Sequence, residues 1–229
     1  MLLNLPKEII IHEIGKYLVE IDRQIIRKTS TFFSSLFPYR LLFFDNTDLE
    51  LVHIKRYQKF WSVETTQKIA KQGDLKCLKY LHKNGCPWDR WTTANAASRG
   101  HLQCLKYLHE NGCPWDEWTT IYAAEGGHLE CLKYARSPSP GIKPCPWDEW
   151  TTAKAAEKGH LECLKYAHSP DSGEPCRWNM LTTGWAALGD HLECLKYAYE
   201  NGCSWDSYTT SCVLQSSECL KYAREKGFI

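Results

Sequence analysis

The chain has 229 residues, 43% of them hydrophobic, and its 28 basic and 27 acidic side chains leave a formal net charge of +1. This length and composition allow one or two globular units with a buried core, and the balanced charge argues against nucleic acid or an anionic membrane as a partner. No run of about 18 apolar residues is present, and Met1 leads directly into a segment with Lys7 and Glu8. We therefore expect no transmembrane span and no signal peptide, and place the protein in the cytoplasm or nucleus.

Residues 1–40 form an N-terminal segment with its own hydrophobic pattern. Pro6 stands in the first turn of a predicted helix, whose apolar stripe continues to Tyr17 and Leu18. After an acidic turn, a second apolar face contains Phe32 and Phe33. Helices this short do not bury their apolar surface alone, so they are expected to pack on the rest of the chain or on a partner. Residues 41–61 are interpreted as a linker with one further helix.

The segment from Leu5 to Phe37 resembles an F-box. It has the Leu-Pro start, an acidic residue two positions later, a closing Tyr-Leu and an Arg-Lys-Thr-Ser-Thr-Phe-Phe segment. The resemblance implies that this segment binds a Skp-family adaptor of a cullin-type ubiquitin ligase. The residues implied to make this contact are Leu5, Pro6, Ile9, Ile14, Leu18, Phe32 and Phe33. The alternative is that residues 1–60 are only a helical cap on the array that follows.

The remainder of the chain is a repeat. The tetrapeptide Cys-Leu-Lys-Tyr occurs six times, ending at Tyr80, Tyr107, Tyr134, Tyr166, Tyr197 and Tyr222. Successive tryptophans at 88, 115, 147, 178 and 205 are 27, 32, 31 and 27 residues apart, and the extra residues of the two long intervals are rich in Pro, Ser and Gly. They are therefore loop insertions. The predicted units are 62–86, 87–113, 114–145, 146–176, 177–203 and 204–229.

The sequence pattern of each unit predicts two short helices. In residues 87–113, the segment Thr92–Ala97 is the first helix, with Asp89 or a threonine oxygen available as its cap. Gly100 permits the left-handed turn that ends it, and residues 101–108 form the second helix. A Cys-Pro-Trp-Asp connection leads to the next unit. In the last unit the Gly-His-Leu turn becomes Gln-Ser-Ser, as expected of a C-terminal cap.

The segment Gly-His-Leu-Glu-Cys-Leu-Lys-Tyr at 159–166 is similar to the ankyrin repeat, whose second helix begins with Gly-His-Leu. The similarity covers residues 62–229, although each unit is about six residues shorter than the usual 33. It implies an all-α, helix–turn–helix solenoid of about six repeats behind the F-box-like segment. The usual hairpin would be reduced to the Cys-Pro-Trp-Asp turn, with its tryptophan filling the space between units. Large DNA viruses and protists carry many proteins that look like this.

The cysteines suggest chemistry, but their distribution favours a structural role. Eleven of the twelve recur at two positions of the repeat, and His101 and Cys104 have a spacing compatible with a metal site. However, Cys104 lies in the predicted inward stripe, and Asp74 replaces the histidine in the first unit. We interpret the cysteines as buried thiols, with a metal site or disulfides as alternatives. No catalytic constellation is present, so we predict no enzyme activity and no cofactor.

The positions that vary between units are candidates for binding. In ankyrin repeats the first helices line the concave side, so the resemblance implies that this strip recognises a target protein. The predicted target-binding residues are Lys68, Asn95, Arg99, Tyr122, Lys154, Lys158 and Trp185. The leading hypothesis is a monomeric adaptor that brings this target to the ligase, with no nucleic acid or membrane partner. The alternative is an ankyrin-type binding scaffold without a ligase connection.

Overall fold

The computed structural model describes residues 62–137, 143–170 and 174–229. The chain divides into two units, Met1–Phe60 and Trp61–Ile229, and all of the described residues belong to the second. The F-box-like segment, with the seven residues implied to bind an adaptor, lies outside them. No helix in the described ranges is long and apolar enough to cross a membrane.

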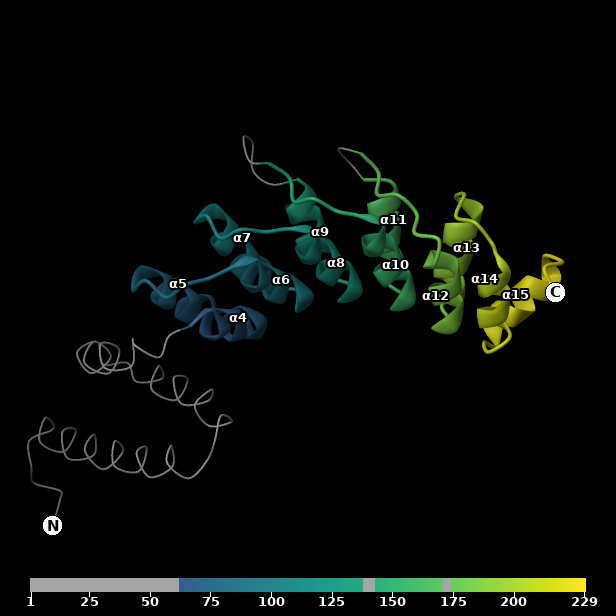
Figure 1. The fold of residues 1–229 in the computed structure, drawn as a ribbon, viewed down its shortest axis with the longest axis horizontal. Coiled ribbons are helices and arrows are strands. Elements are labelled where there is room, and N and C mark those ends of the chain that lie inside the picture. The colour runs from purple at the N-terminus through teal and green to yellow at the C-terminus, as the bar shows by residue number, and fades with distance from the viewer. Residues whose placement is uncertain (1–61, 138–142, 171–173) are drawn as a thin grey trace, which may run out of the picture. The chain divides into compact units, whose positions relative to one another are not determined.

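Twelve helices and no strands make up the described part of the chain, which confirms the all-helical prediction. They form six successive helix–turn–helix pairs along a curved row (Figure 1). The first helices are α4 (Val63–Gln72), α6 (Arg90–Ser98), α8 (Glu117–Glu125), α10 (Glu149–Glu157), α12 (Thr182–Leu188) and α14 (Ser207–Val213). The second helices are α5 (Leu75–Lys83), α7 (Leu102–Glu110), α9 (Leu129–Arg136), α11 (Leu161–His168), α13 (Leu192–Glu200) and α15 (Glu218–Glu225).

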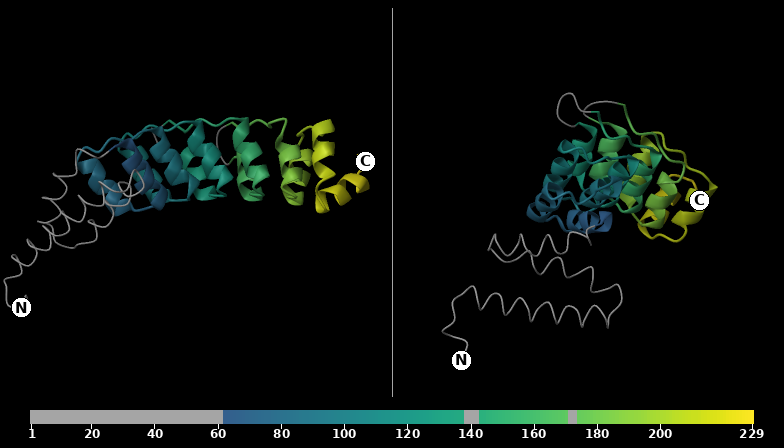
Figure 2. Two further views of the ribbon diagram at one scale, coloured as in Figure 1. Left: turned by 60° about the horizontal axis from the view of Figure 1, so that its bottom comes forward. Right: turned by 60° about the vertical axis from the view of Figure 1, so that its left-hand side comes forward.

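The first helices lie on the inner side of the curve and the second helices on its outer side; two further views show the same row of pairs (Figures 1 and 2). Adjacent first helices approach closely because alanines such as Ala96 and Ala123 face the neighbouring repeat and are fully buried. Behind them, the leucine of each of the first five Cys-Leu-Lys-Tyr segments, for example Leu105 or Leu132, is also fully buried. The core is therefore a continuous row of small and medium side chains, which is how a solenoid buries surface that one repeat alone leaves exposed.

Aspartates start most of the first helices, and they start them earlier than predicted. The carboxylate of Asp89 accepts a hydrogen bond from the backbone N–H of Thr92 at 3.1 Å, and that of Asp206 from Thr209 at 2.8 Å. Such a side chain satisfies an amide that has no partner inside the helix. Helix α6 consequently begins at Arg90 rather than at Thr92, and the tryptophan before each Thr-Thr pair belongs to the first turn.

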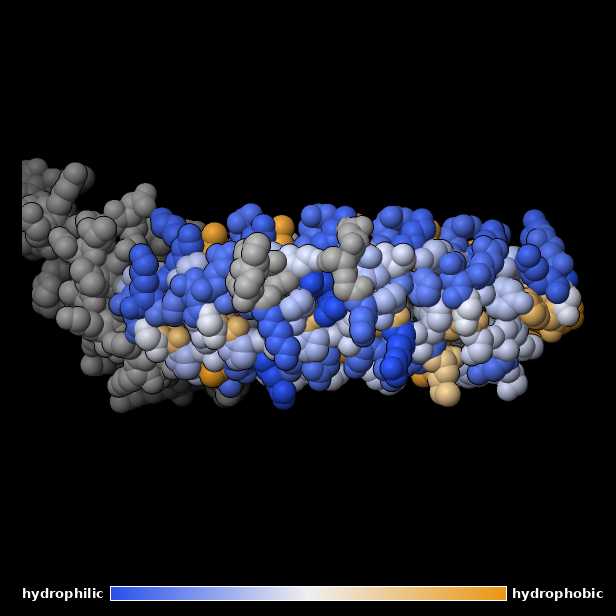
Figure 3. Space-filling view, turned by 90° about the horizontal axis from the view of Figure 1, so that it is seen from above, coloured by the Kyte–Doolittle hydropathy of each residue, from blue (hydrophilic) through white to orange (hydrophobic). Residues whose placement is uncertain are grey.

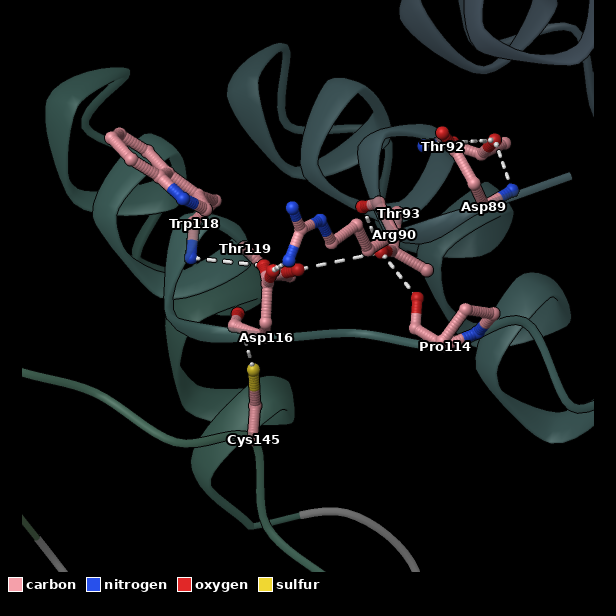
Figure 4. Close-up of polar contacts among 9 residues, drawn as sticks. All are labelled: Asp89, Arg90, Thr92, Thr93, Pro114, Asp116, Trp118, Thr119 and Cys145. Atoms are coloured by element: carbon pink, nitrogen blue, oxygen red, sulfur yellow. Dashed lines mark hydrogen bonds and ion pairs between the residues drawn. The ribbon is translucent and has the colours of Figure 1, made fainter. Parts of the chain in front are cut away.

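Hydrogen bonds to backbone carbonyls stabilise each repeat and connect it to the next (Figure 4). The Thr93 hydroxyl donates to the carbonyl of Pro114 at 3.0 Å, and the Cys145 thiol donates to the carbonyl of Asp116 at 3.1 Å. The same threonine contact recurs at four other junctions between repeats, and the same thiol contact recurs within four other repeats. These groups are fully or almost fully buried, so leaving a partner unpaired would cost about 1–3 kcal/mol at each junction.

The tryptophan of the Cys-Pro-Trp-Asp connection fills the space between the second helices. Trp115 stacks on His109 with ring centroids 3.3 Å apart, and Tyr134 of the next repeat meets it edge-on at 6.2 Å. Similar groups surround Trp88 and Trp178, whereas Arg136 takes the place of the histidine against Trp147. The predicted role of these tryptophans as fillers between units is confirmed.

Candidate functional site

Each first helix exposes one narrow stripe on the inner side of the curve. In α8, Trp118, Tyr122 and Glu125 are accessible, whereas the residues between them are buried against neighbouring helices. These three are spaced four and three residues apart, so they lie on one side of the helix. The same positions in the other first helices form a surface, which we call the inner face.

Two aromatic clusters occupy much of the inner face. In the first, the ring centroid of Trp118 lies 5.7 Å from that of Trp91 and 5.6 Å from that of Tyr122. Trp91 and Tyr122 are 6.4 Å apart, so the three rings form one tilted group across α6 and α8. Trp118 is 38% exposed even within this group.

The second cluster extends across α10, α12 and α14. Trp150, which is 40% exposed, has its ring centroid 5.5 Å from that of Trp185. Tyr208 lies against Gly184 so closely that a Cβ atom at this glycine would come within 2.6 Å of the tyrosine ring. Gly184 therefore allows the Tyr208 ring to reach the side of Trp185.

An ion-pair network lies between the two clusters. The Lys154 Nζ is 3.7 Å from a carboxylate oxygen of Glu125, 2.7 Å from one of Glu157, and 5.0 Å from the centre of the Trp185 ring. Lys158 also binds Glu157, at 2.8 Å. Burial works against ionisation of Glu157, but hydrogen bonds from both lysines hold the pKa of this carboxyl below its usual range. Lys154 thus links the charged stripe of α10 to the second cluster.

The seven predicted target-binding residues all lie in a first helix or at its C-terminal cap: Lys68, Asn95, Arg99, Tyr122, Lys154, Lys158 and Trp185. Tyr122, Lys154 and Trp185 take part in the clusters and the network above, whereas Lys68, Asn95 and Arg99 lie toward the first repeats. Their role in binding stays a prediction.

Sequence reasoning missed the aromatic column that precedes each Thr-Thr pair. Trp91, Trp118, Trp150 and Tyr208 hold this position in four of the six units, so they were assigned to the constant part of the repeat. The spacing could have identified this column, because Trp118 and Tyr122 are four residues apart, as are Leu181 and Trp185. Once the helix is known to start before Thr-Thr, that spacing places both positions on one face.

The cysteines offer neither a metal centre nor a reactive thiol. No group of three or more His, Cys, Asp or Glu side chains within the described ranges is arranged to hold a metal ion. All twelve cysteines fall in these ranges, and all except Cys77 are buried. Burial raises the pKa of the Cys104 thiol to about 11 and that of Cys163 to about 12. Because the thiolate is the nucleophile, these groups are inert at neutral pH.

We expect the native thiols to resist labelling by 5,5′-dithiobis(2-nitrobenzoate) at pH 7.5. A thiol whose pKa rises from 9.0 to about 12 has its thiolate fraction lowered by about a thousandfold. Cys77, which is only half-buried, should react first, and all twelve should react in 6 M guanidinium chloride. Absorbance of the released thionitrobenzoate measures both phases, and rapid labelling of more than two thiols in the native protein would contradict the expectation.

Comparison with known proteins identifies the repeat. Residues 67–144 match the family model for ankyrin repeats in three copies. A crystal structure of the human ASB11 ankyrin repeat domain superposes with a TM-score of 0.53 and 19% sequence identity, over 71% of this chain and 83% of that one. No curated protein sequence is similar to the chain. Ankyrin repeats are typically non-enzymatic scaffolds for protein–protein interaction. The described part of this chain has an ankyrin-repeat-like solenoid fold, and residues 67–144 are similar to ankyrin repeats.

Proposed function

We propose that the repeat array binds a target protein through the inner face. The observation that carries this proposal is the pair of aromatic clusters, in which Trp118 and Trp150 expose 38% and 40% of their surface on helices that are otherwise tightly packed. Exposed aromatic groups of this kind mark interaction sites, and Trp and Tyr are enriched among the residues that dominate binding energy. The array needs no catalytic residue for such a role.

The size and setting of the inner face support the proposal. Five adjacent first helices, α6 to α14, carry the clusters, and helices packed about 8–10 Å apart give them a combined length of about 40 Å. That length suits a protein interface of ordinary size. The face seen from above in Figure 3 is predominantly hydrophilic.

A library of displayed peptides panned against the full-length protein tests this proposal. We expect the selected binders to lose at least tenfold in affinity for the Trp185→Ala variant, because truncating a central aromatic anchor costs about 1.4 kcal/mol or more. The control is Gln103→Ala, which removes an exposed polar side chain from the second helix α7. Binders that respond equally to both variants would show that the inner face is not the binding surface.

We further propose that the F-box-like segment connects this array to a Skp-family adaptor and a cullin-type ligase in the cytoplasm or nucleus. The support is the sequence resemblance of Leu5–Phe37. The protein would then act as a monomeric bridge, which raises the effective concentration of the ligase near the target.

Reciprocal variants of the full-length protein test the bridge in co-purification with a Skp adaptor. Leu18→Asp is expected to abolish adaptor binding and leave peptide binding intact, whereas Trp185→Ala should do the reverse. If wild-type protein binds no adaptor and Leu18→Asp instead lowers the thermal stability of the repeats, the N-terminal segment is a cap. The protein is then a binding scaffold without a ligase connection.

A further inference from the structure

An arginine of the chain itself shows how the inner face can hold a guanidinium group. Arg90 is the first residue of α6, and its guanidinium carbon lies 5.6 Å from the ring centre of Trp91. One of its nitrogens, Nη1, is 3.2 Å from Oδ2 of Asp116, the residue that caps the next first helix, α8 (Figure 4). A single cation therefore contacts an aromatic ring of its own repeat and the capping carboxylate of the following one.

The next junction keeps the tryptophan and the capping aspartate, but it has an acidic residue in place of the arginine. Trp118 corresponds to Trp91, and Asp148 corresponds to Asp116, but Glu117 stands where α6 has Arg90. Glu149 adds another carboxylate as the first residue of α10. In the described ranges, neither Glu117 nor Asp148 lies within ion-pair distance of a cationic side chain.

The carboxylates at this junction influence one another. Burial is the main cause that raises the pKa of Asp148, and the negative charges of Glu149 and Glu117 raise it further. At the preceding junction, Arg90 acts on Asp116 in the opposite direction. Glu117 therefore adds negative charge beside Asp148, whereas Arg90, at the corresponding position of the repeat, supplies positive charge beside Asp116. Among the described residues, only the first of the two junctions has a cation within ion-pair distance, although Arg136 and Arg177 line one hollow with Asp148 and Glu149.

We propose that a partner segment docked on the inner face supplies an arginine at the junction of α8 and α10. Its guanidinium group would lie against Trp118 and donate a hydrogen bond to Asp148, as Arg90 does to Asp116 one junction earlier, and Glu117 would be a second acceptor. This inference rests on the proposed function, and it adds the chemistry of the partner. An arginine-bearing segment complements both the exposed ring and the two carboxylates, which have no ion-pair partner in the described ranges.

Arginine fits this junction better than other cations. Its planar group stacks on an aromatic face and presents five N–H donors, whereas lysine is a strongly hydrated point charge. A metal ion is the weaker candidate, because the carboxylates here are not gathered closely enough to form a metal site in the described part of the chain. A guanidinium group can reach separated carboxylates that a single ion cannot.

The probes that test this proposal are three labelled twelve-residue peptides with the sequences (Gly-Arg-Ser)₄, (Gly-Lys-Ser)₄ and (Gly-citrulline-Ser)₄. Fluorescence anisotropy at low salt measures their affinity for the full-length protein. We expect the arginine peptide to bind at least tenfold more tightly than the citrulline peptide and more tightly than the lysine peptide. The Trp118→Ala variant should lose about tenfold for the arginine peptide, and added salt should weaken binding.

The variant Glu117→Arg gives the sharpest comparison, because it copies the α6 arrangement into α8. The new side chain should occupy the site from within the chain, so that binding of the arginine peptide is lost. The matched control Glu130→Arg introduces the same charge change at an exposed position of the second helix α9 and should bind almost as wild type. Equal affinities for the arginine and citrulline peptides, or equal losses in the two variants, would overturn the proposal.

The same experiment separates this inference from the proposed function. Peptides selected from the display library remain available as probes of the inner face. If they depend on Trp185 while the arginine peptide shows no preference over citrulline, the inner face binds a partner but the arginine assignment is wrong. If no probe depends on Trp185, the proposed function fails as well.

Discussion

Replacing Gly100 by alanine is expected to destabilise the array by about 3 kcal/mol, several times the effect of most surface substitutions. Gly100 ends α6 with φ at +73°, in the left-handed region that disfavours any side chain. A Cβ atom at this position would also come within 2.6 Å of Nδ1 of His128 in the next repeat. The two effects have separate causes and are expected to add.

The His128 ring has little room to move away. On its other side, a Cβ atom added at Gly126 would come within 2.6 Å of the ring carbon Cδ2, so glycines of two repeats enclose the imidazole. The equivalent His101 anchors the preceding turn, with Nε2 3.1 Å from the carbonyl oxygen of Lys71. Burial holds the pKa of His128 below its usual range, which favours a neutral ring at pH 7.

Two control variants divide the effect into its parts. Gly112→Ala tests backbone strain alone, since Gly112 has φ at +84° and no atom within 4 Å of the added Cβ, and it should cost about 1 kcal/mol. Gly126→Ala tests crowding alone, since its φ is −83°, and should cost about 1–3 kcal/mol. Urea unfolding followed by circular dichroism gives the free energies. If Gly100→Ala were no worse than Gly112→Ala, the histidine contact would have no structural importance.

The left-handed turns could be predicted from the sequence, but not the contact between repeats that maintains them. Glycine before the histidine indicated the turn, and the loss of Gly-His-Leu in the last unit indicated a cap. The structure adds that each glycine accommodates the histidine of the following repeat. At the last junction the following repeat has no such histidine, and Asp190 takes the place of the glycine, with φ at +55°. Its carboxylate accepts hydrogen bonds from the Ser216 hydroxyl and from the backbone N–H of Glu218. The sequence shows that the glycine and the histidine are both replaced, but it does not show that the two replacements lie next to each other.

The sequence predicted where the inner face lies, but it predicted only some of the residues that form it. Variation between units indicated Tyr122 and Trp185, because a helical repeat makes its variable positions conspicuous. Trp118 and Trp150 did not vary, so the same criterion left them out of the predicted target-binding residues. Their exposure depends on Asp116 and Asp148, which start the helices two residues before Thr-Thr and thereby turn the tryptophans toward the inner side. Helix boundaries are set by such capping contacts, which a repeat pattern does not specify.

We expect the protein to unfold at mildly alkaline pH, between about pH 9 and pH 10.5, because so many of its cysteines are buried. Burial raises the pKa of Cys131 to about 11 and that of Cys194 to about 12, and it raises the pKa of eight other thiols. In the unfolded chain these groups lose their protons near pH 9. The folded state therefore binds more protons above this pH, and stability falls as pH rises.

The size of the effect follows from the number of thiols. Each group that stays protonated only in the folded state lowers the free energy of unfolding by about 1.4 kcal/mol per pH unit. Ten such groups acting over one pH unit approach the whole stability of a typical domain, about 5–15 kcal/mol. Urea titrations in the presence of a phosphine reductant, at intervals from pH 7 to pH 10, measure the slope.

Cys163→Val provides the matched control for this slope. Valine is apolar and close to cysteine in size, and Cys163 is 1% exposed, so valine adds about one methyl group's volume and removes one ionisable group. The loss of stability between pH 9 and pH 10 should then be smaller by about 1.4 kcal/mol than in the wild type. A stability that stays constant from pH 8 to pH 10 would mean that the thiols are not protected from ionisation by burial. The cysteine column would then need a role other than the packing of the repeats.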